Sequence, residues 1–263
     1  MAQRAIDIVA AALTTVLLTF GLFGSGLVVC MMPQTTQLLG NNFSGWNEAT
    51  YPQDTMSELA EAVRSFSIDD TGRPQLEACV RTALEEHFPD IERTLAAGNT
   101  GQNAAGNLYA GGIGAGNLLS IYTLPASAVD HLEDCIPVFA TSRIMIILSL
   151  VFAAVGIILL IVRRRRNLAG WIMFATPLAV IGIIVALSIW AFVDFDSLFG
   201  QLHTLFFTGG SWIFPADSLL ITLFPESFWM GMGIVWVAVS ILACRALREA
   251  LGTRVVEYRH FTF

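Results

Sequence analysis

The sequence predicts an all-α membrane protein with four transmembrane helices, a helical extracytoplasmic cap domain, and a re-entrant or interfacial loop between spans 3 and 4. The first observation behind this prediction is composition: 55% of the 263 residues are hydrophobic and only 13% are charged. The second is that the apolar residues gather in four long runs separated by polar segments. This composition differs from that of a soluble domain, and a formal net charge of −7 offers no basic face to nucleic acid.

The four apolar runs are the predicted spans, and we place them at residues 1–30, 143–162, 169–193 and 227–247. The first three each supply about 20 or more apolar residues, enough at about 1.5 Å per residue to cross a hydrocarbon core of about 30 Å. The fourth run is shorter and is extended through Leu247. The first run also resembles a signal peptide, but its apolar part exceeds the usual h-region of about 7 to 15 residues. We therefore expect a retained transmembrane helix.

The basic residues predict the orientation in the membrane. All 14 of them are arginines, and nine accompany one set of span ends: Arg4, the four in the loop 163–168, Arg245, and the three in the tail 248–263. Because positive charge marks the cytoplasmic side, we expect both termini to be cytoplasmic. Two segments then lie outside, the cap at 31–142 and the loop at 194–226.

The cap is expected to consist of short helices. Thr55 and Glu58 have the spacing of a capping box, Pro74 suits the first turn of a second helix, and Pro89 is expected to start a third. The glycine-rich stretch 98–117 predicts a surface loop or a lid. A phosphate-binding loop is disfavoured there, because no strand precedes this stretch.

A further helix is predicted at Ala126–Phe139, and it leads into the second span. It carries His131 and Asp134 three residues apart, on one helical face, where a carboxylate can orient an imidazole. Pro137 lacks an N–H group and is expected to distort this helix.

The outer segment 194–226 is too apolar for a solvated loop and too rich in glycine and proline for a spanning helix. Its aromatic residues, among them Phe206, Phe207 and Trp212, suit the interface between membrane and water. His203 lies in the same apolar segment. Because polar groups are costly there, we expect it to face a partner or a cavity.

Together these residues resemble two signatures of one family of four-span bacterial membrane proteins. Leu202–Phe207, Trp212, Asp217–Ile221 and Leu223–Phe228 resemble the longer signature of the lipoprotein intramolecular transacylases. His131–Asp134 resembles the start of the shorter one, His-Met-x-Asp-Val-Lys. Two positions depart from it: Leu132 replaces methionine, and Ile136 replaces a basic residue for which Arg143 would have to substitute.

The resemblance implies an activity in the bacterial cytoplasmic membrane that needs neither cofactor nor nucleotide. Such proteins move the sn-2 acyl chain of a diacylglyceryl-cysteine lipoprotein to the α-amine of that cysteine, which gives a lyso-form lipoprotein. The implied partners are a lipoprotein N-terminus and membrane lipid. His131 and His203 would then be the acid/base pair at the outer membrane boundary. The residues expected to orient this pair or to bind substrate are Asp134, Asp217, Arg143, Trp212, Phe206 and Phe207.

Two other functions remain open at this point. His131, Asp134 and His203 supply donor types that suit zinc, so a metal-assisted lipid hydrolase or acyltransferase is one alternative. A binding or assembly factor without catalysis is the other, and it predicts tolerance to histidine substitution.

The cysteines add one structural hypothesis. Cys79 and Cys135 both fall in the predicted outer domain, where oxidation is possible. A disulfide between them is one expected arrangement, and it would tie the cap to the helix that bears His131.

Overall fold

The computed structural model describes residues 2–45, 50–97 and 120–257. Within these ranges the regular structure is helical and contains no strand. The predicted loop or lid at 98–117 lies outside the described residues. The helices are α1 (Ala2–Cys30), α2 (Pro33–Phe43), α3 (Gln53–Asp69), α4 (Arg73–His87), α5 (Pro89–Ala97), α8 (Ala126–Val162), α9 (Arg166–Val193), α10 (Phe195–Phe206), α11 (Leu219–Leu223) and α12 (Glu226–Glu257).

The chain divides into two compact units. The first, which we call the membrane-helix unit, comprises Met1–Cys30, Thr141–Leu198 and Gly233–Phe263. The second, which we call the cap unit, comprises Met31–Ala140 and Phe199–Met232.

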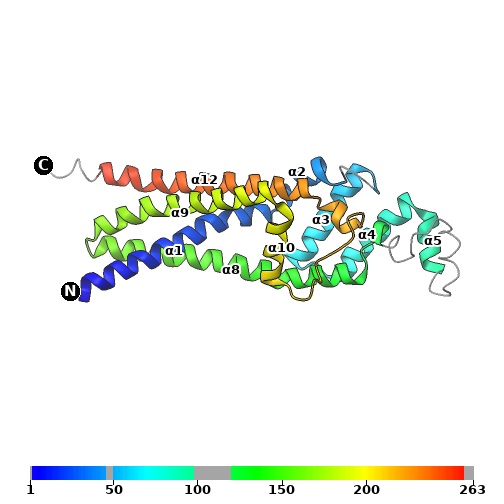
Figure 1. The fold of residues 1–263 in the computed structure, drawn as a ribbon, viewed down its shortest axis with the longest axis horizontal. Coiled ribbons are helices and arrows are strands. Elements are labelled where there is room, and N and C mark those ends of the chain that lie inside the picture. The colour runs from blue at the N-terminus through cyan, green and yellow to red at the C-terminus, as the bar shows by residue number, and fades with distance from the viewer. Residues whose placement is uncertain (1, 46–49, 98–119, 258–263) are drawn as a thin grey trace. The chain divides into compact units, whose positions relative to one another are not determined.

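Four helices are long and apolar enough to cross a membrane, namely α1, α8, α9 and α12, and they run side by side in Figure 1. Buried side chains from all four, including Ala11, Ala153, Ile172 and Cys244, form one apolar cluster. The predicted class of a four-span helical membrane protein is therefore confirmed. One detail differs, because α8 continues through Pro137 without ending, so the expected cap helix and the second span form one helix.

Small residues bring the membrane helices close together. A Cβ atom built on Gly26 would lie 2.2 Å from Cδ1 of Trp236, and one built on Gly156 would lie 2.2 Å from Oγ1 of Thr14. At the first contact, Nε1–H of Trp236 donates to the carbonyl of Phe23 over 2.7 Å. Glycines at such contacts let two backbones approach within a lipid environment.

A buried carboxylate fixes the arginine-rich loop against α1. Asp7 is only 2% exposed, and it accepts from Arg163 Nη1 at 3.1 Å and Arg165 Nε at 2.7 Å. A buried charge needs such partners, because leaving it unpaired is destabilising. Part of the positive loop is thus neutralised within the protein.

The cap unit has its own apolar core. Two predictions on its helices are confirmed, because Pro74 lies in the first turn of α4 and Pro89 begins α5. The capping-box prediction is wrong: α3 begins at Gln53, and Oγ1 of Thr55 hydrogen-bonds instead to Nε2 of His87 at 2.9 Å. The core unites residues far apart in the sequence, including Met56, Leu59, Phe66, Leu76, Leu132, Leu219 and Leu223.

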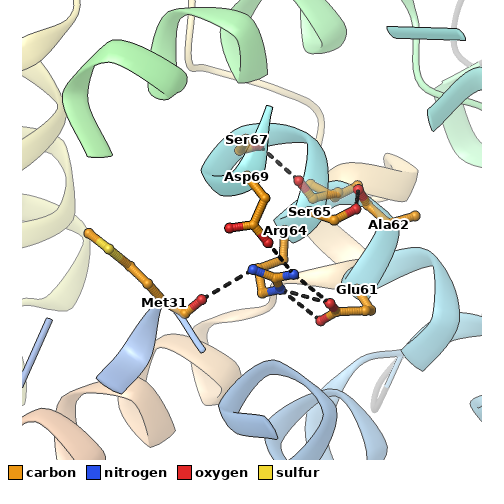
Figure 2. Close-up of polar contacts among 8 residues, drawn as sticks. Met31, Glu61, Ala62, Arg64, Ser65, Ser67 and Asp69 are labelled. Carbon is orange, nitrogen blue, oxygen red and sulfur yellow. Dashed lines mark hydrogen bonds and ion pairs between the residues drawn. The ribbon is translucent and has the colours of Figure 1, made fainter. Parts of the chain in front are cut away.

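Figure 2 shows the polar contacts of Arg64, a buried arginine of the cap unit. Arg64 is 6% exposed, and its guanidinium pairs with Glu61 at 2.7 Å and with Asp69 at 2.8 Å. Its Nη1 also donates to the carbonyl of Met31, the first residue after α1, over 3.2 Å. The charge is therefore satisfied on several sides, as burial of a guanidinium requires.

The segment predicted as an interfacial loop contains two short helices, α10 and α11. Between them the chain turns at Gly209 and Gly210, whose φ angles of 72° and 73° lie in the left-handed region. A residue with a Cβ atom is strained in that region, which explains the glycine pair. The turn carries Trp212 and Phe214 toward the residues of the candidate site.

Candidate active site

His203 lies in the last turn of α10 and is held by the helix itself. Its Nδ1–H donates to the carbonyl of Phe199, four residues earlier, over 2.8 Å. Because a carbonyl can only accept, the neutral ring keeps its lone pair on Nε2. The rings of Phe199 and Trp212 lie against His203, with centroid distances of 4.1 Å and 4.8 Å.

These surroundings also affect the charge of His203. Burial lowers the pKa of its imidazole below the ordinary 6.5, and the hydrogen bond to Phe199 acts in the opposite direction. His203 is consequently neutral near pH 7. A neutral imidazole with a bare Nε2 is suited to accept a proton.

His131 lies in the second turn of α8 and is only 7% exposed. The rings of Phe207 and Phe214 contact it, with centroids at 4.7 Å and 5.8 Å. Its Nε2 lies 3.8 Å from the sulfur of Cys135. Its Nδ1 is buried and has no hydrogen-bond partner in the described part of the chain.

The structure brings the two predicted histidines together. Their ring centroids are 6.1 Å apart and the ring planes are inclined by 31°. Phe207 contacts both rings, at 4.7 Å from His131 and 5.8 Å from His203. Two imidazoles thus share an aromatic enclosure within the cap unit, and the backbone engages only Nδ1 of His203.

A cavity of about 450 Å³ adjoins this enclosure and shares Phe207 with it. One carboxylate and two hydroxyl groups line it beside apolar side chains, so it offers polar and apolar contacts together. The lining residues are Asp134, Pro137, Val138, Phe206, Phe207, Thr208 and Ser211.

Asp134 does not orient His131 in the way the sequence suggested. No hydrogen bond joins the two, because Nδ1 of His131 has no partner and Nε2 faces Cys135. The carboxylate lines the cavity instead, and its negative charge favours the protonated form of the nearby His131.

The remaining predicted residues differ in their placement. Trp212 and Phe207 contact His203 directly, and Phe206 contacts Phe207 at 6.4 Å and lines the cavity. Asp217 is half-buried in the turn before α11, and no hydrogen bond or ion pair joins it to either histidine. Arg143 belongs to the membrane-helix unit and is not placed with this group.

Sequence reasoning missed three contributors to the site. Phe199 supplies the carbonyl that fixes the tautomer of His203, and its spacing of four residues on an apolar helix was the available signal. Phe214 is another of the aromatic residues of segment 194–226 expected at the membrane interface, and its ring contacts His131. Cys135 was considered only as a disulfide partner.

The expected disulfide between Cys79 and Cys135 is not present, and both are free thiols. Cys79 packs on α4 against the core of the cap unit, whereas the sulfur of Cys135 contacts His131. The two side chains therefore lie in different surroundings.

The alternative zinc site depends on how His131, Asp134 and His203 are grouped. Among the residues that the structure describes, no three His, Cys, Asp or Glu side chains are grouped so that they could hold a metal ion. His131, Asp134 and His203 therefore do not form the donor set that this alternative needs.

Comparison with known proteins gives an independent view of this region. Residues 114–229 match the family described as "Lipoprotein intramolecular transacylase Lit". The matched range contains both histidines and every residue that lines the cavity. No curated protein matches the sequence.

Solved structures agree with the fold over nearly the whole chain. The in meso structure of the membrane integral lipoprotein intramolecular transacylase from Bacillus cereus matches with a TM-score of 0.63 and 12% identity, covering 98% of this chain and 100% of that one. A histidine-to-arginine variant of that protein matches with a TM-score of 0.60 and 12% identity, covering 99% and 96%. Similarity at this level of identity establishes a shared fold.

Proposed function

We propose that this chain, whose residues 114–229 match the lipoprotein intramolecular transacylase family, moves the sn-2 acyl chain of a diacylglyceryl-cysteine lipoprotein to the α-amine of the same cysteine. One observation on this chain's own residues supports the proposal. His131 and His203, which are 72 positions apart in the sequence, lie 6.1 Å apart as ring centroids beside a cavity that is both polar and apolar.

For this reaction the protein has to transfer a proton and to orient the two reacting groups. The amine nitrogen forms a bond to the ester carbonyl carbon, the bond from that carbon to the glyceryl oxygen breaks, and the amine proton ends on the glyceryl oxygen. No external acyl donor enters. Since both reacting groups belong to one molecule, holding them together supplies much of the acceleration.

The two histidines divide the work as a base and a donor. Nε2 of His203 carries the lone pair of the neutral ring, so we assign it as the base that takes the amine proton. His131 then acts on the ester oxygens as the donor. A correctly placed acid or base contributes about 10²- to 10⁴-fold in rate.

The cavity supplies groups that suit such a substrate. The carboxylate of Asp134 is complementary to the ammonium of the N-terminal cysteine before its proton is lost. Phe206, Phe207 and Trp212 offer aromatic surface to the acyl chain. Arg143 and Asp217 stay proposed substrate-binding residues on sequence grounds.

The test is to co-express the chain with one defined lipoprotein in a bacterium that has no such activity, and to analyse the N-terminal lipopeptide by tandem mass spectrometry. Because the transfer is an isomerisation, the intact mass is expected to stay the same while one acyl chain moves to a fragment containing the cysteine nitrogen. His131→Ala and His203→Ala are each expected to lower the transferred fraction at least about 100-fold.

His87→Ala is the matched control, because this histidine bonds to Thr55 in the cap unit and is expected to leave transfer unchanged. Normal transfer by either site variant would refute the histidine assignment. An increase in mass by one acyl chain would show an external donor instead. Absence of transfer by the unsubstituted chain would favour the binding or assembly factor.

A further inference from the structure

The thiol of Cys135 is the only protein group that the structure places in polar contact with the ring of His131, among the residues it describes. Its sulfur lies 3.8 Å from Nε2. Cys135 follows His131 by four residues on α8, so the two side chains are stacked on one helical face. The contact is therefore built into the helix and does not depend on a distant loop.

The donor in this contact follows from the chemistry of the two groups. A thiol S–H is a donor, though a weak one, and an unprotonated imidazole nitrogen is a good acceptor, whereas sulfur is a poor acceptor. The favoured arrangement is S–H of Cys135 donating to Nε2 of His131. The single proton of the neutral ring then resides on Nδ1.

Nδ1 of His131 is the atom that lacks a partner. The residue is 7% exposed, and no donor or acceptor from the described chain reaches this nitrogen. A buried polar atom without a partner is destabilising, and such atoms in native proteins call for an explanation. A substrate oxygen that accepts from Nδ1–H provides one.

Burial is the main reason that the ring of His131 stays neutral, because it lowers the pKa of the imidazole below 6.5. His203 faces the ring from α10 and also lowers this pKa, whereas Asp134 on α8 raises it by less. The other facing groups, Phe207 and Phe214, are aromatic and exclude water. The neutral form therefore prevails.

We propose that Cys135 is a positioning residue that holds His131 as the neutral Nδ1–H tautomer, directed to donate to the ester oxygen on which negative charge develops. The inference rests on the proposed function and divides the roles within it. His203 takes the amine proton and returns that same proton to the glyceryl oxygen, while His131 keeps its own. A fixed donor toward a developing oxyanion is a major source of rate acceleration.

Cys135→Val and Cys135→Ser test the role of the thiol, with Cys79→Val as the matched control on α4. The direct readout is ¹⁵N NMR of the imidazole nitrogens in detergent-solubilised full chain at pH 7. In the unsubstituted chain we expect His131 to carry its proton on Nδ1. Cys135→Val is expected to shift the ring toward the other tautomer, whereas Cys135→Ser keeps a donor and the original tautomer.

Kinetics give the second readout. Cys135→Val is expected to lower kcat about 3- to 10-fold, the worth of one hydrogen bond, with KM unchanged. Cys135→Ser is expected to recover part of that loss, and Cys79→Val to match the unsubstituted chain. A structural role alone would lower the amount of folded protein and would leave the tautomer of the folded fraction unaltered.

Three results would overturn the inference: a proton on Nε2 of His131 in the unsubstituted chain, protons on both of its nitrogens at pH 7, or an unchanged spectrum in Cys135→Val. The NMR readout needs no catalysis. If the chain transfers no acyl group, the proposed function is refuted. The NMR spectrum still shows which nitrogen of His131 carries the proton, so the two hypotheses are tested separately.

Discussion

At the scale of single residues, the titration of His203 sets the pH dependence of the proposed reaction. Burial lowers the pKa of His203 below 6.5, and a base works only in its neutral form. After correction for the titration of the substrate's α-amine, the value of kcat/KM is therefore expected to rise with pH, to reach half its plateau below pH 6.5, and to be level well above that half-point. A pH series of initial rates with a detergent-solubilised lipopeptide measures this.

Trp212→Ala is the companion variant. The indole ring lies 4.8 Å from the His203 ring and shields it from water, so its removal is expected to raise the pKa of His203 toward 6.5. The half-point of the profile then moves to higher pH. A half-point above pH 6.5 in the unsubstituted chain, or no shift in the variant, would contradict this account of burial.

The sequence identified the two histidines because each stands out against its surroundings. His203 is polar within an apolar segment, and His131 has a carboxylate three residues later. The tautomers of these histidines could not be predicted from the sequence, because a tautomer depends on contacts between specific atoms. Phe199 acts through its backbone carbonyl, which has no signature in a side-chain pattern.

At the scale of helices, the local sequence predicted helix starts correctly where a proline fixes the backbone. It predicted a helix cap wrongly where a tertiary contact competes for the capping side chain. Pro74 and Pro89 marked helix starts correctly. The Thr55 and Glu58 pair had the spacing of a capping box, yet the hydroxyl of Thr55 is engaged by His87 from α4. The helix α2 was missed, because Pro33–Phe43 has no strong apolar repeat.

The contact between α1 and α12 gives a prediction at this scale. Gly26→Ala would place a Cβ atom 2.2 Å from Cδ1 and 2.7 Å from the backbone oxygen of Trp236, so the helices must separate. We expect a loss of about 1 to 3 kcal/mol, seen as a lower midpoint of thermal unfolding in detergent.

Gly182→Ala on α9 is the matched control, because nothing lies within 4 Å of its built Cβ atom. Its midpoint is expected to stay the same or to rise slightly, since alanine favours a helix. Equal midpoints for the two variants would mean that α1 and α12 do not pack at Gly26 in the membrane-helix unit.

At the scale of the whole molecule, the four spans were predictable from hydropathy alone, because a membrane demands about 20 apolar residues for each crossing. Hydropathy does not reveal that α8 belongs to both the membrane-helix unit and the cap unit. The helix is continuous because it accommodates Pro137 without ending. Average hydropathy along the sequence does not show whether a helix will do so.

Charge distribution leads to our proposal on orientation. Arginines flank the ends at Arg4 and at 163–168, whereas acidic residues outnumber arginines in the segments 31–142 and 194–226. We propose that the arginine-rich ends are cytoplasmic, with the candidate site on the outer side. An acidic outer surface attracts a substrate with a cationic N-terminus.

Paired cysteine substitutions test this orientation. Arg81 is exposed on α4 and Arg164 is exposed in the loop after α8. With the four native cysteines replaced by alanine, Arg81→Cys is expected to react with a membrane-impermeant maleimide in intact spheroplasts, and Arg164→Cys only after permeabilisation. The reverse pattern would invert the topology, and labelling of both in intact spheroplasts would disprove the proposed arrangement.

The buried arginine of the cap unit has a consequence for how the sequence can diverge. Arg64 binds side chains at Glu61 and Asp69 but only the main chain at Met31. The side chain of residue 31 can therefore be exchanged during evolution without removing the acceptor of that bond. Loss of either carboxylate takes away one of the two ionic partners of a buried guanidinium, and loss of Arg64 leaves two carboxylates without their cation. Divergence at these three charged positions is therefore expected to be concerted, whereas residue 31 is under no such charge constraint.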